Sequence, residues 1–118
     1  MTQLSEHFDR IEFACKCACG HDTVDTELLM VLEHVRQYFE KPVIITSGCR
    51  CEEHNRNVGG KVDSLHLFGK AADFVVVDIH PHDVYNFLAC FYTGEYGIGK
   101  GDTYTHIDIR EKRSRWTY

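Results

Sequence analysis

Three short segments rich in β-branched and apolar residues constrain this fold more than any other feature, because each is typical of a buried strand. They span residues 43–46, 71–77 and 104–110. Helix patterns precede each of them: an apolar stripe at Leu28, Leu32, Val35 and Phe39, a short segment over 52–58, and a stripe at Val84, Leu88 and Phe91 after Pro81. The predicted order is therefore helix, strand, helix, strand, helix, strand, and the spacing leaves the strand directions open.

Length and charge limit the class of protein. The 118 residues leave room for one domain, spanning 1–118. A formal net charge of −5 argues against a protein that binds nucleic acid by broad phosphate neutralisation. We interpret the basic C-terminal residues as a solvated tail: Arg110, Lys112, Arg113 and Arg115.

Two patterns that the sequence lacks bear on where the protein is expected to be located. The longest apolar run, 74–77, is far shorter than the roughly 20 residues that a membrane span requires. The polar residues 1–7 lack the pattern of a secretory signal, which predicts synthesis in the cytoplasm without a signal peptide.

Two segments could carry chemistry: Ser64-Leu-His66-Leu-Phe-Gly69-Lys-Ala-Ala-Asp73 and His106-Ile-Asp108. His66 and Asp73 converge on one ion if the chain turns at the glycine, and His106 on a neighbouring strand would supply a third ligand. Two imidazoles and a carboxylate suit zinc better than magnesium or calcium, and they leave one coordination position open.

The surroundings of these residues strengthen the metal hypothesis. Asp73 directly precedes an apolar run, so its charge needs a partner, either a divalent cation or Arg50. The last strand alternates almost perfectly, which places Tyr104, His106 and Asp108 on one face.

Four blocks of this sequence form a combined pattern across residues 43–110: Thr46-Ser47-Gly48-Cys49-Arg50-Cys51, Asn55-x-x-x-Gly59-Gly60, Ser64-x-His66-x-x-Gly69-x-x-Ala72-Asp73, and Gly97-Ile-Gly99 followed by His106-x-Asp108. Together they resemble the zinc D-Ala-D-Ala carboxypeptidases, peptidase family M15, subfamily A. The leading Glu12-Phe-x-Cys-x-Cys-x-Cys-Gly20 is similar to small phage and prophage members.

The resemblance implies an α+β fold shared with the hedgehog signalling domain, in which helices pack on a small, mainly antiparallel sheet. It implies one catalytic Zn²⁺ held by His66, Asp73 and His106. It also implies hydrolysis of peptide bonds in peptidoglycan stem peptides, as a D,D-carboxypeptidase, D,D-endopeptidase or L-Ala-D-Glu endopeptidase. Such an activity serves cell-wall lysis or remodelling, as in phage endolysins.

The general base is the point at which the sequence departs from the family pattern. Relatives commonly place a carboxylate three residues before the last ligand, a position that Thr103 occupies here. Asp102 is our first candidate and Asp108 the second. If neither serves, the chain would be a zinc-stabilised binding module, or a phage structural or tail-assembly protein with a vestigial site.

Three further residues are candidates for contact with substrate. The resemblance suggests that Arg50 steadies a substrate carboxylate or the developing oxyanion, and an ion pair with Asp73 is its alternative. Ser64 is a candidate for a hydrogen bond near the site, with a purely structural loop serine as its alternative. Tyr104 is a candidate donor to the tetrahedral intermediate, and a packing tyrosine is its alternative.

The six cysteines have several possible states. Cys15, Cys17 and Cys19 could bind a second, structural zinc together with His21, Cys49 or Cys51, although their spacing is not that of common zinc knuckles. Disulfides between the 15–19 group and Cys49 or Cys51 are an alternative after release from the cell. We favour free thiols, and we expect Cys90 in the core.

The expected partners follow from this reading. The substrate is a peptidoglycan peptide, and neither nucleic acid nor a membrane is a partner. We expect a monomer that acts at the cell wall, either after phage-type release or as part of a virion.

Overall fold

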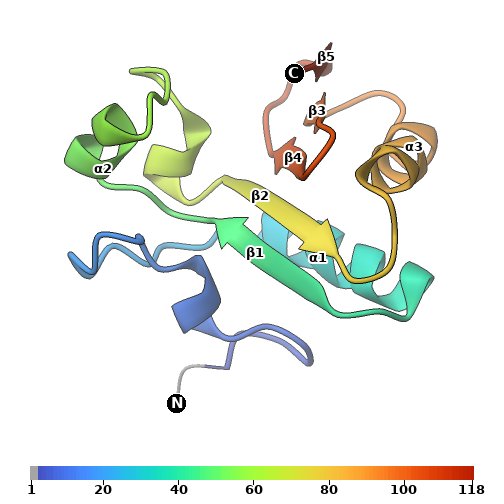
Figure 1. Cartoon of the computed structure of the whole chain (residues 1–118), viewed down its shortest axis with the longest axis horizontal. Helices are drawn as coiled ribbons and strands as arrows, with labels where there is room; N and C mark the ends of the chain where they lie inside the picture. The colour runs from blue at the N-terminus through green and yellow to red at the C-terminus, as the bar shows by residue number, and fades with distance from the viewer. Residues whose placement is uncertain (1–2) are drawn as a thin grey trace.

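A five-stranded sheet forms the centre of the molecule, with strands in the order β1-β2-β4-β3-β5 (Figure 1). The computed structural model describes residues 3–118, so the first two residues of the polar N-terminal stretch lie outside it. Neighbouring strands pair antiparallel except for β3 and β5, which are parallel. The strands are β1 (Val43–Ser47), β2 (Ala71–Val76), β3 (Gly97–Lys100), β4 (Thr105–Asp108) and β5 (Ser114–Thr117). The expected α+β class with a mainly antiparallel sheet is confirmed.

Helices and short 3₁₀ turns connect the strands. They are η1 (Arg10–Phe13), α1 (Thr26–Phe39), α2 (Glu52–Asn57), η2 (Leu65–Phe68) and α3 (Pro81–Phe91). α1 begins where the Asp25 carboxylate accepts hydrogen bonds from the backbone N–H groups of Glu27 and Leu28, and it ends at Glu40 in the left-handed conformation, before Pro42. Figure 1 shows α1 behind β1 and β2, with α3 beside β3 and β4.

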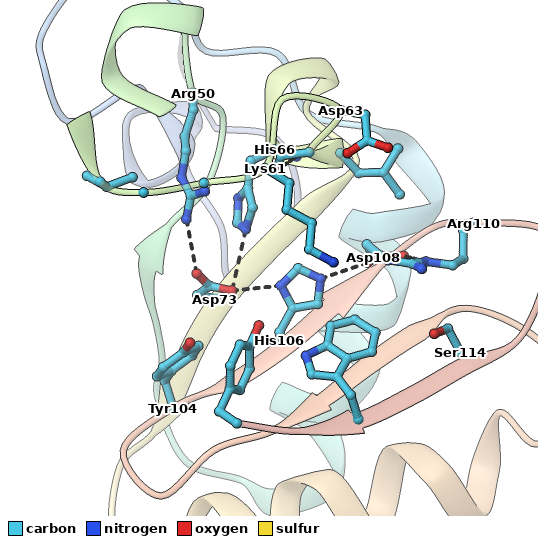
Figure 2. Close-up of a pocket in the computed structure, with 17 residues that line it drawn as sticks. Arg50, Lys61, Asp63, His66, Asp73, Tyr104, His106, Asp108, Arg110 and Ser114 are labelled. Atoms are coloured by element: carbon cyan, nitrogen blue, oxygen red, sulfur yellow. Dashed lines mark hydrogen bonds and ion pairs between the residues drawn. The ribbon is translucent and has the colours of Figure 1, made fainter. Parts of the chain in front are cut away.

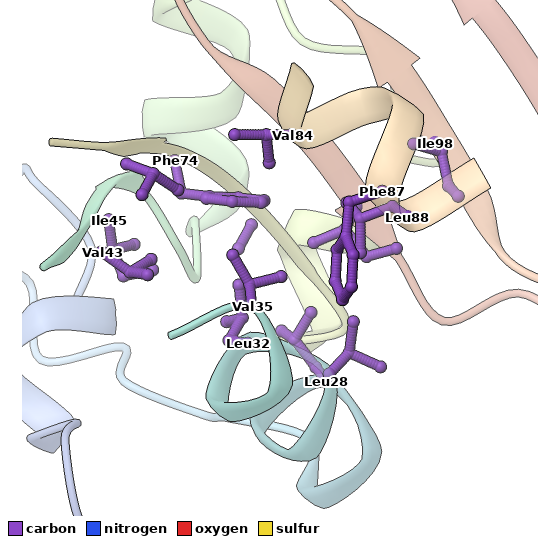
Figure 3. Close-up of a cluster of buried hydrophobic side chains, with 14 of the residues drawn as sticks. Leu28, Leu32, Val35, Val43, Ile45, Phe74, Val84, Phe87, Leu88 and Ile98 are labelled. Carbon is purple, nitrogen blue, oxygen red and sulfur yellow. The ribbon is translucent and has the colours of Figure 1, made fainter. Parts of the chain in front are cut away.

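The hydrophobic core lies between these two helices and one face of the sheet (Figure 3). Its members include Leu28, Leu32 and Val35 of α1, Val84, Phe87 and Leu88 of α3, and Val43, Ile45, Phe74, Ile98 and Ile107 of the strands. Because successive strand residues face opposite sides, Phe74 and Ile107 enter this core while Asp73 and His106 lie on the other face. The candidate site residues therefore occupy the face of the sheet away from α1 and α3.

Two strands of the structure were not predicted from the sequence. The glycine-rich segment after α3 contains β3, and the C-terminal residues expected to form a solvated tail contain β5. The guanidinium of Arg115 donates hydrogen bonds to the backbone carbonyl oxygens of Tyr96 and Tyr92, at 2.7 and 2.6 Å. The prediction of a solvated tail fits Lys112 and Arg113, which are exposed. It was wrong for Arg115, because β5 pairs with the edge of β3, and for Arg110, because its side chain forms an ion pair with Asp108.

The interpretation of Cys90 was also wrong. Cys90 is exposed, because Val84, Phe87 and Leu88 supply the buried face of α3. Within residues 3–118, no helix is both long and apolar enough to cross a membrane.

Candidate functional site

Three side chains that are distant in sequence meet on the open face of the sheet (Figure 2). His66 comes from η2, Asp73 from β2 and His106 from β4, where it pairs in register with Asp73. Asp73 Oδ1 lies 2.8 Å from His106 Nδ1 and 3.4 Å from His66 Nε2. One donor atom from each residue lies within 4.8 Å of the others, so the three residues are close enough to bind one ion.

The remaining nitrogen of each imidazole already has a partner. His66 Nδ1 lies 2.7 Å from the backbone oxygen of Gly48, and because a carbonyl only accepts, this nitrogen carries the proton. His106 Nε2 lies 2.7 Å from Asp108 Oδ2. These contacts leave His66 Nε2 and His106 Nδ1 facing Asp73, where each would bind a metal ion in place of its contact with the carboxylate. A second partner of this kind commonly orients a metal-binding histidine.

The two carboxylate oxygens of Asp73 also have different partners. Arg50 donates from its Nη2 to Asp73 Oδ2 at 3.3 Å, which leaves Oδ1 for the imidazoles. Arg50 is itself held by Ser47 Oγ at 3.0 Å and by Asn55 Oδ1 at 3.1 Å. All three guanidinium nitrogens are thus engaged, and the ion pair considered as the alternative role of Arg50 is present.

The donor set fits a zinc ion. It consists of two imidazole nitrogens and one carboxylate oxygen, each oriented by a protein group, which matches a zinc centre with three protein ligands in which the imidazoles bind in their neutral form. Gly69, at φ 69°, makes the turn from η2 into β2 that brings His66 back over Asp73, as the sequence predicts.

Opposing effects set the charges in the site. Burial raises the pKa of Asp73, but hydrogen bonds with His106 and His66 outweigh it and hold that pKa well below its usual range. Burial lowers the pKa of His106, but hydrogen bonds to Asp108 and Asp73 raise it overall. Burial raises the pKa of Asp108, yet its ion pair with Arg110 and its bond to His106 bring the pKa down to about 2. Both carboxylates are therefore ionised at neutral pH.

Asp108 and Arg110 form a wall beside the imidazoles. Asp108 is 1% exposed, and both its oxygens lie 2.7 Å from nitrogens of Arg110. The ring of Trp116 on β5 lies 5.1 Å from that of His106, and Arg110 lies over the Trp116 ring at 5.2 Å. The C-terminal strand thus covers one side of the site.

Two glycines of β3 make room for this wall. A Cβ at Gly97 would lie 2.5 Å from Asp108 Oδ1, and one at Gly99 would lie 2.6 Å from Trp116 Nε1. Gly97 and Gly99 pair in register with Asp108 and His106. The Gly97-Ile-Gly99 pattern therefore reflects close approach of side chains from two neighbouring strands.

The site opens into a cleft of about 830 Å³, a size that accommodates a short peptide. Ser64 and Tyr104, expected to contact substrate, both line it. Ser64 Oγ also accepts a hydrogen bond from the backbone N–H of His66 at 3.2 Å, so it caps η2. The Tyr104 ring packs at a tilt against that of Tyr118, with ring centroids 5.2 Å apart.

The structure does not support the first candidate for the general base. The Asp102 side chain is 89% exposed and lies 2.9 Å from His82 Nε2, and it does not line the cleft. Asp102 lies in the short turn between β3, which ends at Lys100, and β4, which begins at Thr105, so its side chain is held outside the cleft. Asp108, the second candidate, is buried and ion-paired.

Sequence reasoning missed Asp63, Lys61 and Trp116, all of which line the cleft. Asp63 is exposed, and among the cleft carboxylates within the described residues it is the one without a side-chain hydrogen bond or ion pair. In the sequence it is marked only by its place directly before the Ser64–Asp73 segment. Trp116 is the single tryptophan, placed in a segment whose alternating pattern is too short to stand out.

The fold and site define an α+β protein with a candidate mononuclear metal centre at the base of an open cleft. A comparison with protein families matches residues 6–108 to Peptidase M15, and the chain belongs to this family. Membership makes it a peptide-bond hydrolase by class. A search of curated proteins found no match.

Proposed function

We propose that this protein is a zinc metallopeptidase that cleaves peptide bonds in peptidoglycan stem peptides. The observation that carries the proposal is the meeting of His66, Asp73 and His106 at the base of an open cleft, each with one donor atom within 4.8 Å of the other two. The family match supports the peptidase class. Peptidoglycan as the substrate rests on the motif resemblance.

Zinc would be held by His66 Nε2, Asp73 Oδ1 and His106 Nδ1. When bound, it supplies a Lewis acid that polarises a carbonyl and lowers the pKa of water to about 7. Arg50 and Asp108 act here as positioning residues, because each fixes a ligand and leaves the metal-facing atom free.

We assign proton transfer to Asp63. Its carboxylate lies at the cleft and has no competing partner within residues 3–118. In hydrolysis it would take a proton from the attacking water and return it to the leaving amine, so that the carbonyl carbon gains hydroxide and the nitrogen gains hydrogen. Asp108 cannot serve equally well, because a group with a pKa of about 2 is a weak base.

Substrate carboxylates have a candidate partner in Lys61. It is exposed, lines the cleft, and in Figure 2 extends over the site beside His106. Stem peptides carry free carboxylates, so a cation at this position favours them over neutral peptides. We further propose that the protein acts as a monomer at the cell wall, after phage-type release or within a virion.

The test is digestion of purified sacculi followed by mass spectrometry of the muropeptides. We expect cleaved stem peptides from the wild-type protein, loss of product with a chelator, and recovery with added zinc. His106→Ala should be inactive, while His82→Ala, which changes a surface histidine outside the cleft, should retain activity. Products that persist in chelator would contradict the proposal.

A binding role without turnover is the second candidate. It is favoured by the engagement of Asp73 and Asp108 in ion pairs, which leaves Asp63 alone among the cleft carboxylates of residues 3–118 to move a proton. Zinc-dependent retention of muropeptides with no cleavage product would support this role over that of a peptidase.

A further inference from the structure

A second group of potential ligands lies outside the cleft. The sulfur atoms of Cys15, Cys17, Cys19 and Cys51 all lie within 4.8 Å of one another. Three of them come from one short loop, and the fourth comes from the start of α2, 32 residues or more further along the chain. We propose that these four cysteines bind a second zinc ion as thiolates, in a structural site separate from His66, Asp73 and His106.

The distances between sulfurs fit this geometry. Cys15 Sγ lies 3.4 Å from Cys17 Sγ and 3.9 Å from Cys51 Sγ, and Cys17 Sγ lies 3.6 Å from Cys51 Sγ. Tetrahedral zinc with Zn–S bonds of about 2.3 Å places its sulfurs about 3.8 Å apart. These three separations bracket that value, the Cys19 sulfur lies within 4.8 Å of the other three, and all four cysteines are free thiols rather than disulfide-bonded.

The backbone of the loop makes this arrangement possible despite the unusual Cys-x-Cys-x-Cys spacing. Ala18 and Gly20 both have positive φ, at 64° and 97°, and the N–H of Ala18 donates to the carbonyl oxygen of Cys15 at 3.0 Å. The N–H of Cys15 donates to the carbonyl oxygen of His21 at 2.7 Å, which closes the loop. The turn therefore gathers the three thiols of this loop at one point.

Backbone donors also point at two of the sulfurs. The N–H of Cys51 lies 3.5 Å from Cys15 Sγ, and the N–H of His54 lies 3.3 Å from Cys51 Sγ. Such bonds stabilise a negatively charged sulfur more than a neutral one. Four thiolates at these distances require a cation, since their mutual repulsion is otherwise uncompensated.

The site would fix the segment that supports the cleft. Cys51 follows Arg50, whose backbone N–H donates to the carbonyl oxygen of His66 at 2.9 Å. Gly48, three residues before Cys51, accepts from the His66 ring. A metal at the cysteine cluster would thus hold residues 48–51 between the N-terminal loop and the candidate catalytic centre.

Zinc content per chain tests the proposal on the full-length protein purified under reducing conditions. We expect two zinc equivalents in the wild type, one in Cys17→Ser and one in His106→Ala. Cys90→Ser is the matched control, because Cys90 is exposed and far from the cluster in sequence, and it should keep two. A cobalt-substituted His106→Ala protein should show strong thiolate-to-cobalt absorption, and the Cys17→Ser variant should lack it.

A thiol titration that leaves all cluster residues in place tests the same proposal without depending on the folding of the cluster variants. In the Cys90→Ser protein, which lacks the exposed thiol outside the cluster, a thiol-specific mercurial should release one zinc equivalent as the four cluster thiols react. Equal zinc content in the wild type and Cys17→Ser, without thiolate absorption, would overturn the inference. The inference would also be overturned if intact mass spectrometry detected disulfide bonds in protein purified with zinc and reductant. If wild type and His106→Ala both hold one zinc with thiolate absorption, the cysteine site stands and the catalytic zinc fails.

Discussion

At the scale of single residues, the side chains of the candidate centre are oriented by hydrogen bonds and ion pairs with neighbouring protein groups. Asp73 gives one oxygen to Arg50 and the other to the imidazoles, while the two histidines each use one nitrogen for Gly48 or Asp108. This division fixes which atoms face the metal before any ion binds. Changing a supporting residue should therefore alter metal affinity as well as rate.

Arg50→Lys tests the support of Asp73. A lysine keeps the charge but cannot reach Ser47, Asn55 and Asp73 together, as the guanidinium does. We expect zinc affinity at the His66 centre to fall about 10- to 100-fold. Competition with a chromophoric chelator measures this affinity, and Arg56→Lys on the exposed side of α2 is the control. An unchanged zinc affinity would indicate that Arg50 contacts the substrate rather than supporting the metal ligand Asp73.

Asp63→Asn tests proton transfer. The amide is nearly isosteric but cannot take a proton, so we expect kcat to fall about 10²- to 10⁴-fold while zinc content stays the same. Asp102→Asn is the matched control and should leave kcat unchanged, because that side chain lies outside the cleft. Full activity in the Asp63 variant would remove this residue from the chemistry.

At the scale of elements, the sequence predicted those whose residues are regular enough to show a period. α1 contains the predicted apolar stripe, β1 begins at the predicted residue 43, and α3 begins at Pro81, since these signals act locally. β3 and β5 were missed because their residue types depend on packing against neighbouring strands, β4 for β3 and β3 for β5, and this packing leaves no regular pattern in the sequence. The same reason explains why the candidate site was predicted only in part. The three donors have local signals, but the choice between Asp63, Asp102 and Asp108 depends on tertiary contacts.

Glu33 joins the N-terminal segment to α1 and gives that element a pH dependence. Its carboxylate accepts from Ser5 Oγ at 2.5 Å and from the backbone N–H of His7 at 2.8 Å. Burial raises its pKa, but these bonds and the His7 ring lower it below 4.5 overall. A lowered folded-state pKa means that the stabilisation is present above pH 4.5 and is lost as the pH falls through the lower value.

Glu33→Gln should therefore destabilise the protein by about 1–3 kcal/mol at pH 7, because hydrogen bonds to a charged acceptor are weakened. The difference from wild type should shrink as the pH drops below 4.5. Urea unfolding at several pH values measures both effects. Glu111→Gln, at an exposed position, is the control. A constant difference across this range would show that the Glu33 charge is not involved.

At the scale of the whole molecule, the metal sites and the core act on the same folded state. The His66 centre joins η2, β2 and β4, and the cysteine cluster joins the N-terminal loop to α2. Ligands that bind the folded chain alone stabilise it by mass action. Metal removal should therefore lower the melting temperature of the entire chain.

Zinc at about 100 times its Kd contributes about 2.7 kcal/mol per site, which corresponds to a Tm increase of roughly 10 °C for a chain of this size. Calorimetry with and without chelator measures the shift. His106→Ala should show a smaller response to zinc than the wild type, because it retains only the cysteine site. A Tm that chelation leaves unchanged would argue against both sites.

The position of Trp116 has a practical consequence. This side chain is the single tryptophan of the chain, and its ring packs at a tilt against that of His106, one of the three candidate ligands, with centroids 5.1 Å apart. Its fluorescence is therefore an intrinsic optical reporter located at the metal centre. Titrations and stopped-flow experiments can follow that signal directly, without attaching a dye to the protein.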